Sequence, residues 1–184
     1  MESIRGFIAI DLHSTPQIID FVQKITTSGA DIKLVDLKII HITLKFLGDV
    51  NENKIDFIDQ IIKNSIQEIH PFTIHLKGTG VFPNENYMKV VWIGIQKTEP
   101  IKRITNTLEE QLEPLGFMRE KRNFSPHLTI GRVRTAKNKP QLLKVLKEFV
   151  NIEFGEQEIT SIKMKKSDLT PAGPIYTTLR EIPL

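Results

Sequence analysis

Two short segments of the chain carry the residue types that could do chemistry together. One reads His-Ile-Thr-Leu and begins at His41, and the other reads His-Leu-Thr-Ile and begins at His127. In a β-strand, residues i and i+2 lie on the same face, about 7 Å apart, so each segment would present an imidazole beside the hydroxyl of Thr43 or Thr129. Imidazole titrates near neutral pH, so one ring can accept a proton while the other donates one, and hydroxyls can donate to the oxygens of a phosphate. The two segments therefore predict a site for paired general acid–base chemistry.

The extended pattern is specific, although each half of it has a simpler explanation. The segment from His13 to Thr15 also fits His-x-Thr, but it is better explained as a loop and a helix cap. Among the five histidines of the chain, two matches to the extended pattern would occur by chance with a probability on the order of 10⁻⁴. A single histidine on a strand more often has a structural role, so it is the duplication that favours catalysis.

Two other uses of these histidines fit less well. Zinc needs three or four protein ligands, whereas each His-x-Thr segment offers one. No Asp, Glu or Cys lies within two residues of His41 or His127. Neither segment holds a serine and an acid, as a serine-type triad would require. A two-histidine site is therefore preferred to a metal site or a triad.

The elements that would position these segments alternate along the chain. Short apolar runs rich in β-branched residues predict strands, and apolar residues at helical spacing predict helices. Ser14 or Thr15 before Pro16 predicts the first helix cap, and Gly116 predicts the end of the third helix. The predicted strands cover residues 4–11, 32–35, 39–47, 72–81, 87–95, 128–133, 158–164 and 175–182, and the predicted helices cover residues 18–25, 55–69, 101–115 and 142–150.

The order of these elements repeats once. A strand containing residues 7–10, a helix and a strand that begins at His41 recur as a strand containing residues 92–95, a helix and a strand that begins at His127. We therefore expect an α+β fold in one two-lobed domain over residues 1–184, with approximate repeat halves 1–86 and 87–184. Each lobe would be an antiparallel or mixed sheet with helices on its outer face, and the site would lie in the cleft between the lobes.

The composition is that of a globular protein. Of the 184 residues, 40% are hydrophobic and 26% are charged, which suits a sizeable core. No stretch approaches the roughly 20 apolar residues that span a bilayer, so we expect no membrane association. The opening residues lack the order of a signal peptide, and the absence of cysteine is in keeping with a cytoplasmic protein.

The net charge of +3 says little, but its distribution is uneven. Lys and Arg dominate residues 119–147, where Glu120 is the only acid, whereas residues 49–68 lean towards acids. A basic stretch attracts phosphates through counterion release. Charge alone nevertheless favours an ordinary solvated face.

The residues around both histidines resemble a known family. Residues 41–48 (HITLKFLG) and 127–133 (HLTIGRV) are similar to the motifs of the 2H phosphoesterase superfamily, and within it to the RNA 2′,3′-cyclic phosphodiesterases, also called 2′-5′ RNA ligase-like proteins. The resemblance covers nearly the full length and includes residues 5–11, 80–83 and 169–176. At the paired His and Thr positions the chain shows no departure from the family.

The resemblance implies an activity and a role for each residue of the pair. A member of this family would hydrolyse the 2′,3′-cyclic phosphate at an RNA end to a 2′-phosphomonoester, without a metal or any other cofactor. By analogy His41 is the general acid and His127 the general base, while Thr43 and Thr129 bind the phosphate oxygens. Because the two motifs are equivalent, only the analogy decides which histidine is the acid.

The resemblance also assigns Arg132 to phosphate or ribose and Phe46 to stacking on the terminal base. Each lies five residues after its histidine, so strict alternation would place both on the opposite face. Each strand should therefore bend or end by then, near Gly48 and at Gly131. The alternatives are a core aromatic for Phe46 and a solvated strand-end charge for Arg132.

The implied partner is RNA with 2′,3′-cyclic phosphate ends, with tRNA fragments as one candidate, and we expect a monomer. Two alternative functions stay open: a 2′-5′ RNA ligase that joins ends like those of tRNA halves, and a non-catalytic RNA-binding module that uses residues 119–147. We expect Tyr87 and Trp92 to serve packing, and we assign no role to His70 or His75.

Overall fold

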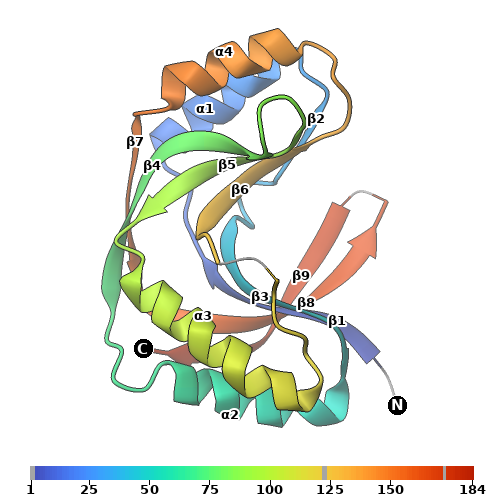
Figure 1. The fold of residues 1–184 in the computed structure, drawn as a ribbon, viewed down its shortest axis with the longest axis vertical. Helices are drawn as coiled ribbons and strands as arrows, with labels where there is room; N and C mark the ends of the chain where they lie inside the picture. Colours follow the sequence, from blue (N-terminus) through green and yellow to red (C-terminus); the bar gives the residue numbers. More distant parts are fainter. Residues whose placement is uncertain (1–2, 122–123, 172) are drawn as a thin grey trace.

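The structure is a computed structural model that describes residues 3–121, 124–171 and 173–184. Arg122 of the basic stretch and Ala172 of the closing segment lie outside the described residues. Two sheets face each other across the middle of the molecule, with helices on their outer sides (Figure 1). We call these two halves of the molecule lobe A and lobe B. The α+β, two-lobed fold expected from the sequence is confirmed.

Lobe A contains a four-stranded sheet in the order β3-β1-β8-β9, in which every pair is antiparallel. Helices α2 and α3 pack against each other and against this sheet. The strands are β1 (Ser3–Asp11), β3 (His41–Asn51), β8 (Ser161–Thr170) and β9 (Gly173–Pro183), and the helices are α2 (Ile55–Ser65), which follows a short 3-10 turn at Glu52–Lys54, and α3 (Glu99–Leu112), which runs into a second 3-10 turn at Glu113–Leu115.

Lobe B contains a five-stranded sheet in the order β2-β6-β5-β4-β7, also antiparallel throughout. Helices α1 and α4 pack together, α1 against β7 and α4 against β4. The strands are β2 (Ile32–Leu34), β4 (Phe72–Pro83), β5 (Met88–Gln96), β6 (His127–Val133) and β7 (Glu153–Ile159), and the helices are α1 (Pro16–Thr27) and α4 (Lys139–Phe149). No described helix is long and apolar enough to cross a membrane.

The internal repeat is interleaved between the lobes. Strands β1 and β3 pair in lobe A while α1, which lies between them in the chain, packs in lobe B. Strands β5 and β6 pair in lobe B while α3, between them, packs in lobe A. Each half of the sequence thus contributes to both lobes, so a boundary near residue 86 does not separate them. The single domain with halves 1–86 and 87–184 stays a prediction.

The first helix shows how the local sequence fixes the entry into lobe B. Thr15, rather than Ser14, is the N-cap: its Oγ1 accepts a hydrogen bond from the Ile18 amide at 3.2 Å. The same hydroxyl donates to the Phe154 carbonyl at 2.6 Å. Since a capping hydroxyl satisfies an amide that has no partner inside the helix, one residue both begins α1 and ties it to β7.

Strand β7 is absent from the sequence prediction, which instead extends one strand over residues 158–164. In the structure β7 ends at Ile159 and β8 begins at Ser161. Strand β7 lies at the sheet edge, and its buried side chains are Phe154, Gln157 and Ile159, between exposed glutamates. Charged edge strands resist pairing with other chains, and the same charges hide the apolar alternation that would have revealed the strand.

Candidate active site

Both histidine segments lie on strands with the alternation expected from the sequence. His41 and Thr43 are half-buried on β3, whereas the intervening Ile42 is fully buried. On β6, His127 and Thr129 are half-buried and the apolar residues after them are buried. The apolar residues enter the core, and each imidazole shares the opposite face of its sheet with a hydroxyl.

A β-bulge changes the alternation at the same place in both strands. Leu44 on β3 is skipped in the pairing with β1, and Ile130 on β6 is skipped in the pairing with β5. An extra residue of this kind reverses the side-chain alternation beyond it. Phe46 and Arg132 therefore return to the face of the histidines, and both are exposed.

These bulges decide two expectations. The strand was expected to bend or end near Gly48: β3 does not end there but continues to Asn51, and its pairing with β1 is irregular at Leu44 and again at Leu47, beside Gly48. Phe46 is 61% exposed, which rules out the core aromatic considered from the sequence. Gly131 follows the bulge in β6, where a Cβ would lie 2.8 Å from the Ile32 side chain.

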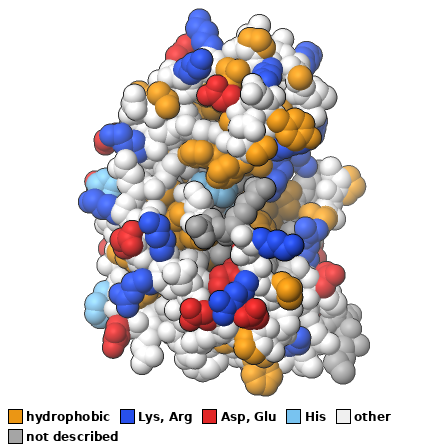
Figure 2. Space-filling model, viewed as in Figure 1, with side chains coloured by type: hydrophobic (Ala, Val, Ile, Leu, Met, Phe, Trp, Pro, Cys, Tyr) orange, Lys and Arg blue, Asp and Glu red, His pale blue; other side chains and the backbone are white. Residues whose placement is uncertain are grey.

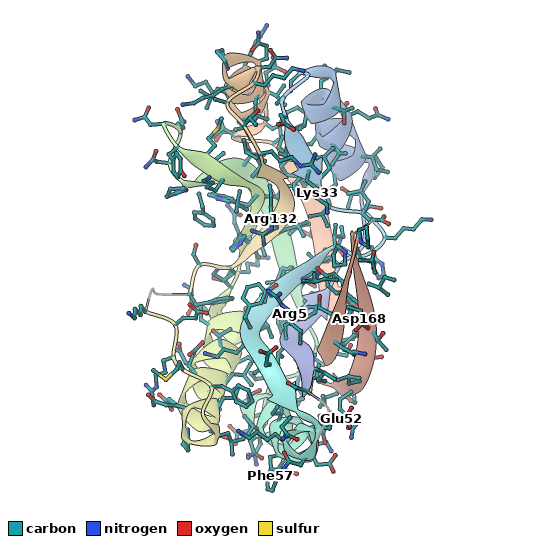
Figure 3. The ribbon with its side chains drawn as sticks, turned by 90° about the vertical axis from the view of Figure 1, so that its right-hand side faces the viewer. Arg5, Lys33, Glu52, Phe57, Arg132 and Asp168 are labelled. Carbon is teal, nitrogen blue, oxygen red and sulfur yellow. The ribbon has the colours of Figure 1, made fainter. Side chains whose placement is uncertain are left out.

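The two histidine strands approach each other between the lobes. Cα atoms of β3 and β6 come within 8 Å of one another. The Tyr176 ring of lobe A lies 5.3 Å from the His41 ring, and it is close enough to Arg132 of lobe B for that charge to act on its pKa. Arg132 and Arg5 lie on the two sides of the gap between the lobes (Figure 3), and a histidine side chain is visible in the middle of the molecule from the view of Figure 1 (Figure 2). The strands that carry the two motifs thus meet where the lobes face each other.

The two imidazoles are held by matching hydrogen bonds. Nδ1 of His41 lies 2.9 Å from the Ile39 carbonyl oxygen, and Nδ1 of His127 lies 2.8 Å from the Ser125 carbonyl oxygen. A carbonyl only accepts, so each Nδ1 must carry the proton. Nε2 of each ring is then the atom that can take or give a proton.

The surroundings of His41 are crowded and charged. Its ring centroid lies 5.2 Å from that of Phe7 and 5.3 Å from that of Tyr176. Burial lowers the pKa of His41 and the charge of Lys165 lowers it further, outweighing the hydrogen bond to Ile39 and the charge of Asp11, which raise it.

An ion pair between the buried Lys165 and the half-buried Asp11 lies beside His41. Asp11 is the partner of His41 in the register of β1 and β3, and Lys165 Nζ donates to Asp11 Oδ1 at 2.6 Å. Burial raises the pKa of Asp11, but hydrogen bonds from Lys165 and Lys163 outweigh this and lower it. Asp11 therefore stays ionised, and nothing in the sequence signalled this role beyond the resemblance of residues 5–11.

His127 has fewer close neighbours. The Phe82 ring meets it edge-on at 5.0 Å and also packs on Trp92 at 5.2 Å. Trp92 fills the space over Gly80, where a Cβ would lie 2.3 Å from the indole, so its expected packing role is confirmed. The corresponding expectation for Tyr87 is wrong: at the turn between β4 and β5 it is 61% exposed.

Several side chains of the described residues could bind an anion. Among the described residues, no hydrogen bond involves the hydroxyl of Thr43 or Thr129, and no ion pair involves Arg132, Arg5 or Lys33. Lys33 is the partner of Arg132 in the register of β2 and β6. No group of three or more His, Cys, Asp or Glu that could hold a metal ion occurs in residues 3–121, 124–171 and 173–184.

Comparison with known proteins now decides the family. The model of the 2′-5′ RNA ligase superfamily matches residues 15–168. This chain belongs to that superfamily. A protein of Methanocaldococcus jannaschii named RNA 2′,3′-cyclic phosphodiesterase is 41% identical over 180 residues, covering 97% of this chain and 99% of the relative. One of the same name from Methanothermobacter thermautotrophicus is 37% identical over 180 residues, covering 96% of each chain.

Solved structures share the whole fold. A crystal structure of a Thermus thermophilus protein is 25% identical, with a TM-score of 0.81 and 98% coverage of both chains. A structure of Escherichia coli LigT is 24% identical, with a TM-score of 0.72, covering 100% of this chain and 99% of that one. The family that the two His-x-Thr segments resemble is therefore confirmed along the chain.

Proposed function

We propose that this superfamily member hydrolyses the 2′,3′-cyclic phosphate at RNA ends and leaves a 2′-phosphomonoester. The observation that carries the proposal is the matched pair of half-buried imidazoles, each fixed through Nδ1, on strands that approach each other between the lobes. Relatives of 41% and 37% identity named RNA 2′,3′-cyclic phosphodiesterase support the choice of substrate.

The proposed reaction is an in-line attack of water on phosphorus. His127 Nε2 takes a proton from the water as its oxygen bonds to phosphorus, and the P–O3′ bond breaks. His41 Nε2 gives its proton to the departing O3′, so the product carries the phosphate on O2′. Groups on opposite sides of phosphorus suit this displacement, because attack and departure occur on opposite faces.

The remaining residues of the proposed site bind the substrate. Thr43 and Thr129 donate to the non-bridging oxygens, where charge builds up in the transition state. Arg132 binds phosphate or ribose, and the exposed Phe46 ring offers a stacking surface for the terminal base. Imidazoles, hydroxyls and a guanidinium would suffice, so we propose that catalysis needs no metal.

The lowered pKa of His41 has a consequence for its proposed role as the acid. In the free protein at neutral pH its Nε2 is more often unprotonated than that of an ordinary histidine. The anionic phosphodiester bound beside the ring would favour the protonated form. Substrate binding would therefore increase the fraction of His41 that carries the proton needed for its role as the acid.

The direct test is product analysis with a defined oligonucleotide that ends in a cyclic phosphate, in excess EDTA. Chromatography that separates 2′- from 3′-phosphates identifies the leaving oxygen. The proposal expects the 2′-phosphate alone, at a rate that chelation does not change. A 3′-phosphate product, or loss of activity in EDTA, would contradict it.

A ligase activity is a second candidate, because the matching family model is that of the 2′-5′ RNA ligases. The same groups could act in the same direction with the 5′-hydroxyl of another RNA in place of water: its oxygen bonds to phosphorus, the P–O3′ bond breaks, and a 2′-5′ linkage results. An assay with a pair of tRNA halves separates the two, since joined product appears only with ligation. We propose tRNA fragments as one substrate and a monomer as the working form in the cytoplasm, and size-exclusion chromatography tests the monomer.

A further inference from the structure

A basic pocket lies on lobe B at the end of β6 away from His127. It has a volume of about 130 Å³ and lies between the turn joining β4 to β5 and the loop joining β6 to α4. Its lining includes Lys89, Arg134, Lys137 and Lys139 and contains no acidic residue. The Lys139 ammonium donates to the Asn86 carbonyl at 2.8 Å, which holds the two loops together. Four basic side chains are thus held close together at this pocket.

The other basic side chains of the pocket could bind a ligand. Among the described residues, no ion pair involves Lys89, Arg134 or Lys137. Arg134 and Lys137 are exposed; the Arg134 amide donates to the Asp31 carbonyl at 2.8 Å, and the Lys137 amide donates to Thr135 Oγ1 at 3.3 Å. Unpaired, exposed cations on a fixed backbone suit the binding of phosphates.

An exposed aromatic ring stands beside these cations. Tyr87 is 61% exposed, and Lys89 Nζ lies 4.5 Å from the centroid of its ring. Bases of single-stranded RNA stack on such rings, and neighbouring cations hold the phosphates between them. The combination of ring and cation therefore favours a nucleic acid strand over a free inorganic anion.

The pocket continues the proposed active site. Arg132 faces the interlobe space beside Lys33 (Figure 3), and Val133, the next residue of β6, lines the pocket. Val133 is six positions after His127 in β6, so their Cα atoms should lie about 20 Å apart. Cations thus follow β6 from the cleft to the pocket.

We propose that the RNA strand on the 5′ side of the cyclic phosphate leaves the cleft along β6 and binds this pocket through its phosphates and one stacked base. The proposal rests on the proposed function, because it needs an RNA end in the cleft. The outer side of lobe A is a poorer exit: α2, α3 and the 3-10 turns beside them carry more acids than bases. Acidic side chains are also frequent in the lower part of the face in Figure 2, where lobe A lies.

The test compares kcat/KM for a nucleoside 2′,3′-cyclic phosphate with that for an oligonucleotide of about eight nucleotides with the same end. The test variant is R134A/K137A. The matched control is K144A/K147A, which removes the same charge from exposed positions of α4 outside the pocket. Wild type and control should show the same gain with length, and R134A/K137A should lose most of it. Y87A should lose part of it.

Salt sharpens the test. Each phosphate contact to a single strand contributes about 0.7 to the slope of log affinity against log salt. R134A/K137A would lack two phosphate contacts. Between about 50 and 200 mM salt, its kcat/KM for the oligonucleotide should therefore fall about sevenfold less than that of wild type. Equal losses in both double variants, or no gain with length in wild type, would overturn the path. Failure of wild type to hydrolyse even the nucleoside cyclic phosphate would instead overturn the proposed function.

Discussion

The two histidine strands share one frame but have different neighbours. On both, the histidine Nδ1 is fixed by the carbonyl two residues before it, and a bulge three residues later returns a side chain to the face of the histidine. In lobe A, His41 lies between two aromatic rings near a Lys165–Asp11 ion pair, whereas in lobe B, His127 meets one ring edge. The duplicated frame repeats the same histidine geometry in both lobes, while burial and the charge of Lys165 lower the pKa of His41.

The residue after each bulge also differs between the two lobes. In lobe A, where β3 is the edge strand, it is Lys45, which turns into the core and bonds Glu109 of α3 and the Met118 carbonyl, each at 2.6 Å. In lobe B it is Gly131, because β2 covers β6 there and leaves no room for a side chain. The backbone bulge is thus the same in β3 and β6, whereas the elements that pack against it differ.

The largest expected effect comes from removing either imidazole. H41A and H127A should each lower kcat by about 10²–10⁴-fold, the usual contribution of a general acid or base. Far-ultraviolet circular dichroism should show an unchanged fold, because both rings are only half-buried. H70A, at an exposed position outside the motifs, is the control and should keep full activity. If either catalytic variant keeps turnover near that of H70A, the two-histidine mechanism is wrong; if wild type itself shows no turnover but binds RNA, the protein is a non-catalytic RNA-binding module.

The next effect is on stability and separates the two bulges. K45M should lower the free energy of unfolding by about 3 kcal/mol, because Glu109 would lose the partner of a buried ion pair. For a chain of this size the melting temperature should fall by about 6–12 °C. K45M/E109L should recover much of the loss, since it leaves no unpaired charge. A K45M protein as stable as wild type would show that the ion pair does not hold β3 against α3.

A smaller effect should distinguish the two side chains that the bulges expose. F46A should weaken oligonucleotide binding by about 1–3 kcal/mol, the range for loss of one base–aromatic stack, without salt dependence. R132A should weaken binding more at low salt than at high salt, because it removes a phosphate contact. Binding isotherms at two salt concentrations measure both. Identical salt responses of the two variants would contradict the assigned roles.

The smallest expected effect is a shift of pH dependence in lobe A. The lowered pKa of His41 means that this imidazole stays neutral at mildly acidic pH where an ordinary one is protonated. If His41 is the acid, kcat/KM of the free enzyme falls on the alkaline side through this lowered pKa. K165M removes a charge that lowers it and should move that limb to higher pH. If K165M moves the acidic limb instead, His41 is the base and the roles are exchanged.

The sequence was sufficient for features that depend on local alternation. It located both motif strands, placed His41 and Thr43 on one face, and predicted an α+β fold with two lobes. It could not reveal the bulges at Leu44 and Ile130, because each depends on pairing with a strand far away in the sequence. It indicated that the side-chain alternation must change before Phe46 and Arg132 if they are to share a face with the histidines, but it did not indicate how the backbone makes that change.

The neighbours of His41 show the same limit. Phe7 and Tyr176 lie at opposite ends of the sequence and meet on one imidazole through the pairing of β1, β8 and β9. No local pattern reports such a contact. The interleaving of the two halves was hidden for the same reason, because a repeated order of elements does not say which sheet each element joins.

The most direct measurement follows both imidazoles while one phosphate binds. Nuclear magnetic resonance of the ring signals, assigned with H41A and H127A, would be recorded during titration with a nucleoside 2′-phosphate. Both rings should shift with a single dissociation constant, and both should become harder to deprotonate in the complex. If only one ring responds, or if the two respond with separate constants, the histidines do not flank a common phosphorus.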